Sequence, residues 1–342
     1  MTTHNPQPDI WLEDCITGMA SHLEPASVDL CVTSIPFGAL FMYSGKPEDI
    51  GNNQDGIDMR AGQFGLHMRF FIEQLKRVLR PGRNACIHIQ QLLRYVNQHG
   101  YMGRRDFRGA VVDMFTAGGL QWIGELVIPK NPQAIAQRLS LHSLMFITGK
   151  RDATKLAPAV NDYMMIFQQP GDADPPVKSI RDAEINPAGW VRTDEWVKWA
   201  SGVWEDIQET DVLDGWRSAR DKDEEKHVCP LQLEVIRRCI RLYTNPGELV
   251  LDPFMGIGST AYVAMEQVRR CVGFEIKESY HALALRNLEK KRVAMEEEKR
   301  DLFSLVQTSP TSDGQRTLIE AMGEITRYPP VEQALAKTGG GK

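Results

Sequence analysis

The chain has 342 residues and a formal net charge of −5 at pH 7, with 42% hydrophobic and 25% charged residues. This composition is typical of a globular protein with a full core, and it excludes the collagenous, disordered and disulfide-scaffold classes. The small negative charge argues against a polyanion binder that uses its whole surface, but it allows a local basic face.

Along residues 1–169, short apolar strands alternate with amphipathic helices, a pattern typical of a Rossmann-like α/β sheet. The expected elements are a strand at 9–15, a helix to about Leu23, a strand at 28–34, a helix around 65–79 and a strand at 85–91. The Pro81-Gly82 pair is expected to stop the second helix. After a helix near 106–117, three β-rich runs predict an antiparallel edge on a mostly parallel sheet: QWIGELVIP, LMFITG and DYMMIFQQP.

The remaining residues divide into three parts. Residues 170–226 are rich in Pro, Asp and Trp and lose the apolar periodicity, so we expect a separate, partly irregular module. Residues 227–295 return to the α/β pattern, and 296–342 are expected to form a charged helix and a flexible tail. In the α/β part we expect a helix at 230–243, a strand at 248–254, a helix from Ser259, a strand at 270–276 and a helix over 279–293.

No apolar run approaches the roughly 20 residues of a membrane span, and the N-terminus lacks a signal pattern, so we expect a cytoplasmic protein without a membrane partner. The cysteines show no C-x-x-C pair, and we predict that they are reduced core residues and that no metal is bound. They are Cys15, Cys31, Cys86, Cys229, Cys239 and Cys271.

A glycine-rich turn follows the strand ELVLDPF and places Asp252, Gly256 and Gly258 between a strand and a helix, where open α/β sheets bind ligands. The turn lacks the Lys of a P-loop and the third Gly of the dinucleotide fingerprint. The next strand ends in Glu275, whose carboxylate suits both ribose hydroxyls of a nucleoside. Asp252 suits the cationic amino-acid group of a ligand, with the alternative that it caps the helix. The apolar Phe254 could flank a sulfonium group of the same ligand.

The segment LVLDPFMGIGSTAYVAMEQVRRCVGFEI resembles the cofactor motif of S-adenosylmethionine-dependent DNA amino-methyltransferases. HVCPLQLEVIRRCIRLYTNPGE is similar to the helix of that family that helps to bind the methionine portion, although Val228 replaces the usual Pro. IWLEDCITGMASHL is similar to the element whose Asp accepts from the adenine amine. The resemblance implies a class I methyltransferase sheet and a cofactor site formed by Asp14, Cys15, Asp252, Pro253, Phe254, Gly256, Gly258, Thr260 and Glu275.

The segment Ser34-Ile35-Pro36-Phe37 resembles the catalytic [DNS]-P-P-[YFW] motif of the same family, with Ile35 where most members have Pro. It precedes the cofactor turn, which matches the circularly permuted β class, and the resemblance covers most of 9–295. It makes 1–169 the catalytic half and 227–295 the cofactor-binding half. Because these two halves are occupied by chemistry and cofactor, target recognition is expected in the Trp-rich module at 170–226, with the alternative that its Trp residues fill a small core.

The chemistry of an exocyclic amine explains these catalytic residues. Its lone pair is delocalised into the ring, so acceptors such as Ser34 Oγ and the Ile35 carbonyl are needed to return electron density to the nitrogen. The base must be flipped out of the duplex, and Phe37 offers a stacking surface. Carbon-5 methylation needs a Pro-Cys nucleophile, and no Pro-Cys dipeptide occurs here.

Ser at the first motif position is more frequent in N4-cytosine enzymes, which we favour over the alternative, N6-adenine. Two further alternatives for the function remain. One is a catalytically weak DNA-binding decoy, a protein that keeps the fold but has diverged at Ile35, and the other is a methyltransferase that acts on RNA or a small molecule.

Basic side chains between 129 and 155 are predicted to contact phosphates of double-stranded DNA, with a merely solvated basic face as the alternative. They are Lys130, Arg138, Lys150 and Arg151. The segment KNPQAIAQRLSLHSLMF is similar to one common in phage-encoded members of the family, so we expect the protein to act in a bacterial or phage-infected cell. We also expect a restriction-modification setting and a protein that is a monomer or a homodimer. Residues 39–62 are predicted to form a loop that closes over the base.

Overall fold

The structure is a computed structural model that describes residues 7–37, 46–50, 62–94, 96–138, 141–215 and 230–308, without the side chains at 97, 98, 138 and 302–308. Most of the predicted closing loop at 39–62 and the tail beyond 308 therefore lie outside the described residues.

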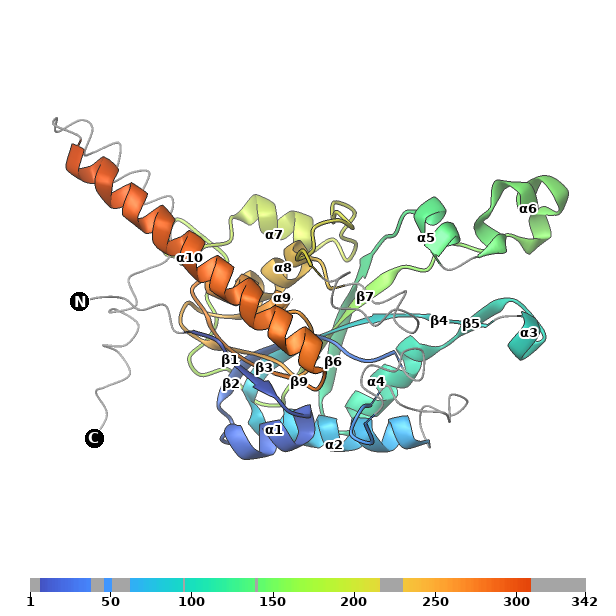
Figure 1. The fold of residues 1–342 in the computed structure, drawn as a ribbon, viewed down its shortest axis with the longest axis horizontal. Coiled ribbons are helices and arrows are strands. Elements are labelled where there is room, and N and C mark those ends of the chain that lie inside the picture. The colour runs from blue at the N-terminus through green and yellow to red at the C-terminus, as the bar shows by residue number, and fades with distance from the viewer. Residues whose placement is uncertain are drawn as a thin grey trace.

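A seven-stranded sheet runs through the centre of the molecule in the order β1-β9-β8-β2-β3-β7-β6 (Figure 1). The first five strands in this order are parallel to one another, and β7 is antiparallel to both β3 and β6. This is the predicted mostly parallel sheet with an antiparallel pair at one edge. The strands are β1 Asp9–Leu12, β2 Val28–Ser34, β3 Leu79–Gln90, β6 Gln121–Ile128, β7 Asp162–Gln168, β8 Leu249–Asp252 and β9 Arg270–Glu275.

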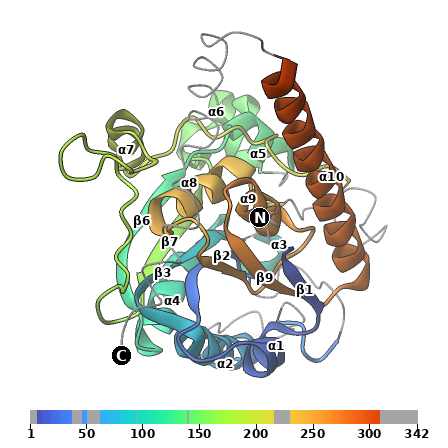
Figure 2. The same ribbon diagram turned by 90° about the vertical axis from the view of Figure 1, so that its left-hand side faces the viewer.

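Helices cover both faces of the sheet (Figure 2). One face carries α1 Cys15–His22, α2 Gln63–Val78 and α4 Phe107–Ala117, and the other carries α8 Leu233–Tyr243, α9 Ser259–Glu266 and α10 Glu278–Thr308. Alternate residues of β2 serve the two cores, because successive side chains of a strand point to opposite faces. Leu30 and Val32 pack in the α8–α9 core, whereas Cys31, between them, packs in the α1–α2 core.

Smaller elements project from the β6 side of the sheet (Figure 1). The hairpin of β4 Leu92–Arg94 and β5 Gly103–Arg105 carries α3 Val96–His99 at its tip. The connection from β6 to β7 contains α5 Pro132–Arg138, α6 Phe146–Arg151 and two short 3-10 turns, His142–Leu144 and Ala153–Lys155. Helix α7 Thr193–Trp199 lies within the predicted irregular module.

The expectation of a β-rich run at LMFITG is wrong, since residues 146–151 form helix α6. The apolar side chains of this run find no sheet to pack on: Phe146 is 74% exposed and Ile147 is 50% exposed. Strand propensity is expressed mainly through such packing, which explains the failure. Other differences are small: α2 ends at Val78 and β3 begins at once at Leu79, and α10 continues past Val293 to Thr308.

Five cysteines are buried and free, as predicted, and Cys229 lies outside the described residues. Within the described ranges, no helix is long and apolar enough to cross a membrane. The same ranges contain no group of three or more His, Cys, Asp or Glu side chains placed to hold a metal ion.

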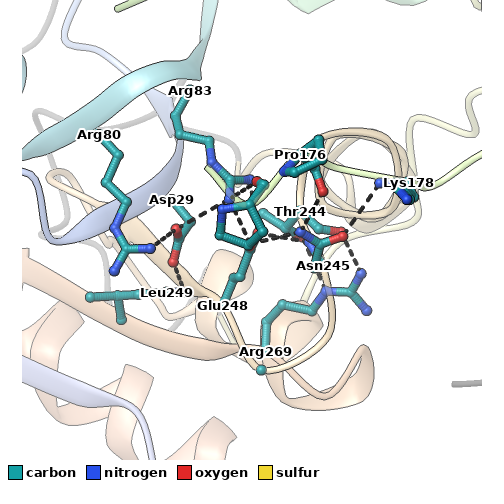
Figure 3. A network of polar contacts seen from close by, with 12 residues as sticks. Asp29, Arg80, Arg83, Pro176, Lys178, Thr244, Asn245, Glu248, Leu249 and Arg269 are labelled. Carbon is teal, nitrogen blue, oxygen red and sulfur yellow. Dashed lines mark hydrogen bonds and ion pairs between the residues drawn. The ribbon is translucent and has the colours of Figure 1, made fainter. Parts of the chain in front are cut away.

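A buried ionic network joins the strands at the edge opposite their carboxyl ends (Figure 3). The guanidinium of Arg83, whose side chain is 1% exposed, binds both carboxylate oxygens of Glu248 at 2.6 and 3.0 Å. It also lies 3.6 Å from Asp29, which Arg80 approaches to 3.1 Å. Burial raises the pKa of Asp29, and Asp29 accepts from the backbone N–H of Leu249. The network therefore links β2, β3 and β8.

Replacing Arg83 with methionine is expected to destabilise the fold by about 3–5 kcal/mol, because two carboxylates lose a shared buried partner. The measurement is urea unfolding. Arg80→Met is the comparison: the Arg80 side chain is 36% exposed and pairs with Asp29, and its loss leaves the pair of Arg83 with Glu248 intact, so it is expected to cost less than the loss of Arg83. Equal losses for the two variants would contradict a special role for the buried guanidinium.

Candidate active site

The site lies where the sheet changes winding direction. From β8 the chain crosses to β9 on one side, and from β2 it crosses to β3 on the other, so a crevice opens between β8 and β2. A pocket occupies this crevice and contains Ser34, Asp252 and Glu275, the last residues of their strands. Further lining residues include Asp14, Cys15, Pro36, Leu231, Pro253, Phe254, Gly256, Thr260, Ile276 and Tyr280.

The carboxylate of Asp252 organises the turn that follows β8. It is 4% exposed and accepts from Thr33 Oγ1 and Thr260 Oγ1, each at 2.6 Å, and from the N–H of Phe254 at 3.0 Å. Burial raises the pKa of Asp252 to about 6 in spite of these bonds. The alternative that Asp252 caps helix α9 is wrong, because Gly258 occupies the N-cap position. Asp252 instead ties β2, β8 and α9 together beside the pocket.

The two glycines of the turn have left-handed backbones, with φ of 56° at Gly256 and 93° at Gly258. A Cβ on Gly258 would lie 3.2 Å from the Cβ of Ala284 in α10, whereas a Cβ on Gly256 would meet no atom within 4 Å. Gly256 lines the pocket, so its backbone is the part of the turn that a ligand can approach closely.

Glu275 is a buried carboxylate held by backbone donors at the end of β9. It is 8% exposed and accepts from the N–H groups of Gly256 at 2.7 Å and Lys277 at 2.8 Å. Burial raises its pKa to about 7. A carboxylate has about four acceptor sites, so acceptor capacity remains for the hydroxyl donors of a ligand.

Asp14 lies next to Glu275, because the N–H of Glu13 donates to the carbonyl of Glu275. Its Oδ1 caps helix α1 by accepting from the N–H groups of Ile16 and Thr17, both at 3.0 Å. Cys15 is 5% exposed, and burial raises the pKa of its thiol, so this residue contributes shape to the pocket and not a thiolate.

The predicted catalytic segment begins at the end of β2. Ser34 Oγ lies 2.9 Å from His88 Nδ1, and Pro36 lines the pocket. Ile35 is 2% exposed and packs in the α1–α2 core, so a packed side chain holds the backbone where the family usually has a proline ring. The Phe37 ring lies 6.0 Å from the ring of His88 and 6.2 Å, edge to face, from that of Phe107.

The four predicted phosphate-contacting residues have different environments. Lys130 is 6% exposed and its ammonium lies 2.8 Å from Asp162, so the expectation that it meets phosphate at the surface is wrong. Lys150 and Arg151 are exposed at the end of α6. Arg138 ends α5, and its side chain lies outside the described residues.

Two further arginines and two tryptophans make their contacts within the protein. Arg104 donates to backbone carbonyls in the segment before β7, and Arg108 pairs with Glu125. Trp199 and Trp204 are buried beneath the guanidinium of Arg238, so they fill the core, which was the alternative to target recognition.

His88 and Asp162 were missed by the sequence analysis, as were the pocket-lining residues Ile276 and Tyr280. A single His within the apolar strand ACIHIQQ carries no motif. Only its place near the end of a strand, beside the predicted catalytic strand, indicated a position near the site.

Known proteins resemble this chain in sequence or in fold. The type II methyltransferase M.MjaI of Methanocaldococcus jannaschii is 26% identical over 229 residues, which cover 66% of this chain and 68% of that protein. M.BglI of Bacillus subtilis is 30% identical over 129 residues, 37% of this chain and 30% of its own length. TTHA0409 of Thermus thermophilus, a candidate DNA modification methylase solved with S-adenosyl-L-methionine, has a TM-score of 0.59 at 19% identity, covering 83% of this chain and 94% of its own. The cytosine-N4-specific PvuII DNA methyltransferase has a TM-score of 0.56 at 16% identity, covering 84% and 90%.

The sequence profile of the N6/N4 DNA methylase family matches residues 28–286, more than half of the chain. The chain therefore belongs to this family, the S-adenosylmethionine-dependent DNA amino-methyltransferases that its motifs resemble.

Proposed function

We propose that this protein transfers a methyl group from S-adenosylmethionine to an exocyclic amine of a base in double-stranded DNA, and that N4 of cytosine is the acceptor. The observation that carries the proposal is that Ser34 lines the same pocket as Asp252, Gly256 and Glu275. One pocket thus contains both a serine hydroxyl that could accept from an amine and a strand-end carboxylate suited to the hydroxyls of a nucleoside.

The pocket residues fit the cofactor in chemical type. Glu275 offers acceptor sites to two ribose hydroxyls, Asp14 offers an acceptor to the adenine amine, and the Gly256 backbone allows close approach. When bound, S-adenosylmethionine supplies an electrophilic methyl group. Ser34 Oγ and the Ile35 carbonyl then hold the amine, and Phe37 stacks the flipped base.

N4 of cytosine is supported by serine at the first position of the catalytic motif, and N6 of adenine is the alternative. The test is to methylate DNA of mixed sequence with the purified protein, digest it to nucleosides and identify the modified one by mass. N4-methyldeoxycytidine is expected, N6-methyldeoxyadenosine in its place would identify adenine as the acceptor, and no modified nucleoside would overturn the proposed activity. An RNA substrate run in parallel tests the nucleic-acid class.

Cofactor affinity is expected to fall roughly tenfold between pH 8 and pH 6, because Glu275, with a pKa of about 7, must be ionised to accept two hydroxyl donors. Protonation below pH 7 removes acceptor sites, so affinity is lost as the pH falls. Calorimetry across this range measures the effect. Glu275→Gln is expected to bind more weakly at every pH and to lose most of the dependence; an unchanged slope in this variant would remove Glu275 from the site.

The exposed end of α6 is the proposed contact to DNA phosphates. Replacing Lys150 and Arg151 with serine is expected to weaken duplex binding and to reduce the slope of log affinity against log salt by about 2, with unchanged cofactor affinity. The matched control is the exposed pair Lys299 and Arg300 on α10, on the other side of the molecule (Figure 1). Equal slopes for the two double variants would place the DNA face elsewhere.

A further inference from the structure

Four strand ends bring a polar cluster together behind the catalytic serine. Ser34 in β2 pairs in register with His88 in β3. The next strand, β7, runs antiparallel, so its first residue, Asp162, lies at the same edge of the sheet and pairs with Gln90. His88 and Asp162 are therefore diagonal neighbours on one face. Lys130 reaches the same place from just beyond the end of β6.

The side chains form a continuous chain of contacts. Ser34 Oγ lies 2.9 Å from His88 Nδ1, and His88 Nε2 lies 3.1 Å from Asp162 Oδ2. The Lys130 ammonium lies 2.8 Å from the same oxygen, and Gln90 Nε2 donates to Asp162 Oδ1 at 2.9 Å. His88, Asp162 and Lys130 are each 6–7% exposed, whereas Ser34 lines the pocket. The cluster thus meets the pocket through the serine.

The charge of Asp162 favours one of the two tautomers of His88. Burial would raise the pKa of Asp162, but His88 and Lys130 hold it at about 2, so the carboxylate is ionised at neutral pH. An anion 3.1 Å from Nε2 favours the tautomer with hydrogen on Nε2. Nδ1 then has a free lone pair, and Ser34 must donate its hydroxyl hydrogen to it. Lys130 balances the charge of Asp162, which avoids an uncompensated buried anion.

We propose that His88 is a positioning residue for methyl transfer: with Asp162 behind it, it turns the Ser34 hydroxyl hydrogen away from the pocket and presents the oxygen lone pairs to the target amine. This inference rests on the proposed function, since it requires that Ser34 faces the base. A freely rotating hydroxyl would sometimes point its hydrogen into the pocket. In that orientation it could not accept a hydrogen bond from the N–H groups of the target amine. His88 therefore makes the serine a dedicated acceptor.

The test compares two replacements of similar size by single-turnover methyl transfer with saturating cofactor and DNA. His88→Leu removes the acceptor and is expected to reduce the rate at least about tenfold. His88→Asn retains an acceptor near the position of Nδ1 and is expected to stay within about threefold of the wild-type rate. Cofactor affinity and the midpoint of thermal unfolding are measured for both. Equal slowing of the two variants would overturn the proposal.

A double-mutant cycle separates positioning from a general structural role. If His88 acts through Ser34, adding His88→Leu to Ser34→Ala is expected to slow the reaction by less than about twofold further. Multiplicative losses would overturn the proposal. The proposal would also be overturned if His88→Leu reacted at the wild-type rate while Ser34→Ala was slow. That result would leave the proposed function intact. A wild-type rate for Ser34→Ala would instead overturn the site assignment on which both depend.

Discussion

Ser34→Ala is expected to slow methyl transfer by about 100-fold or more, while cofactor and duplex affinities change less than about threefold. The lost hydrogen bond matters most as the amine nitrogen becomes positive, so the effect falls on the chemical step and not on binding. Removal of one well-placed polar group from other active sites costs rates of this order. Single-turnover kinetics on saturating DNA measure the step directly.

The matched control for this experiment is Ser27→Ala. Ser27 directly precedes the same strand at its opposite end, and its hydroxyl donates to the carbonyl of Glu24. This variant is expected to react at the wild-type rate. Phe37→Ala should harm both binding and rate, because stacking of a base on an aromatic ring contributes about 1–3 kcal/mol. A fast Ser34→Ala enzyme would show that the catalytic site is elsewhere.

Gly256→Val is expected to weaken S-adenosylmethionine binding by at least about 100-fold. A Cβ at this position projects into open space beside the pocket, where the cofactor must approach the backbone, and a β-branched residue is strained at a φ of 56°. Calorimetric titration measures the affinity.

Gly247→Val separates the two causes of this expected loss. Gly247 lies in the turn before β8, has a φ of 80°, and a Cβ there also meets no atom within 4 Å. It is not among the residues that line the pocket, so this variant bears similar backbone strain without filling the site. We expect lower stability with unchanged cofactor affinity. A similar loss of affinity in both variants would show that strain, and not occupation of the site, is responsible.

Strong local patterns predicted most of the sheet. The limits of β2 at 28–34 were predicted to the residue, because a buried apolar run is bounded by turn residues on one side and the catalytic motif on the other. The hairpin β4–β5 was missed because its strands have three residues each, too short for a periodic signal. LMFITG failed for a different reason: its apolar residues indicate a strand only when a sheet is available to cover them.

Site residues that belong to a continuous sequence motif were predicted. Site residues that come together only through the pairing of distant strands were missed. Ser34 and Glu275 were placed at strand ends, and the structure brings them into one pocket. The contact of His88 with Asp162 depends on the register between β3 and β7, which residue patterns do not specify even where they predict an antiparallel edge. Lys130 was misjudged for the same cause, since local charge does not reveal a buried partner that lies in a different strand.

The central pairing of β2 with β8 has a consequence for synthesis. Thr33 and Asp252, which share a 2.6 Å hydrogen bond, are 219 residues apart in the chain. At the usual ribosomal rate of about 5–20 residues per second, β2 leaves the ribosome roughly 10–40 s before its partner strand. During that time one edge of a strand that belongs in the core has no neighbour, a state prone to pairing with other chains. A chain interrupted before residue 249 would lose both its cofactor turn and the protection of its central strand, so we expect incomplete translation products to aggregate and not to persist as inactive fragments.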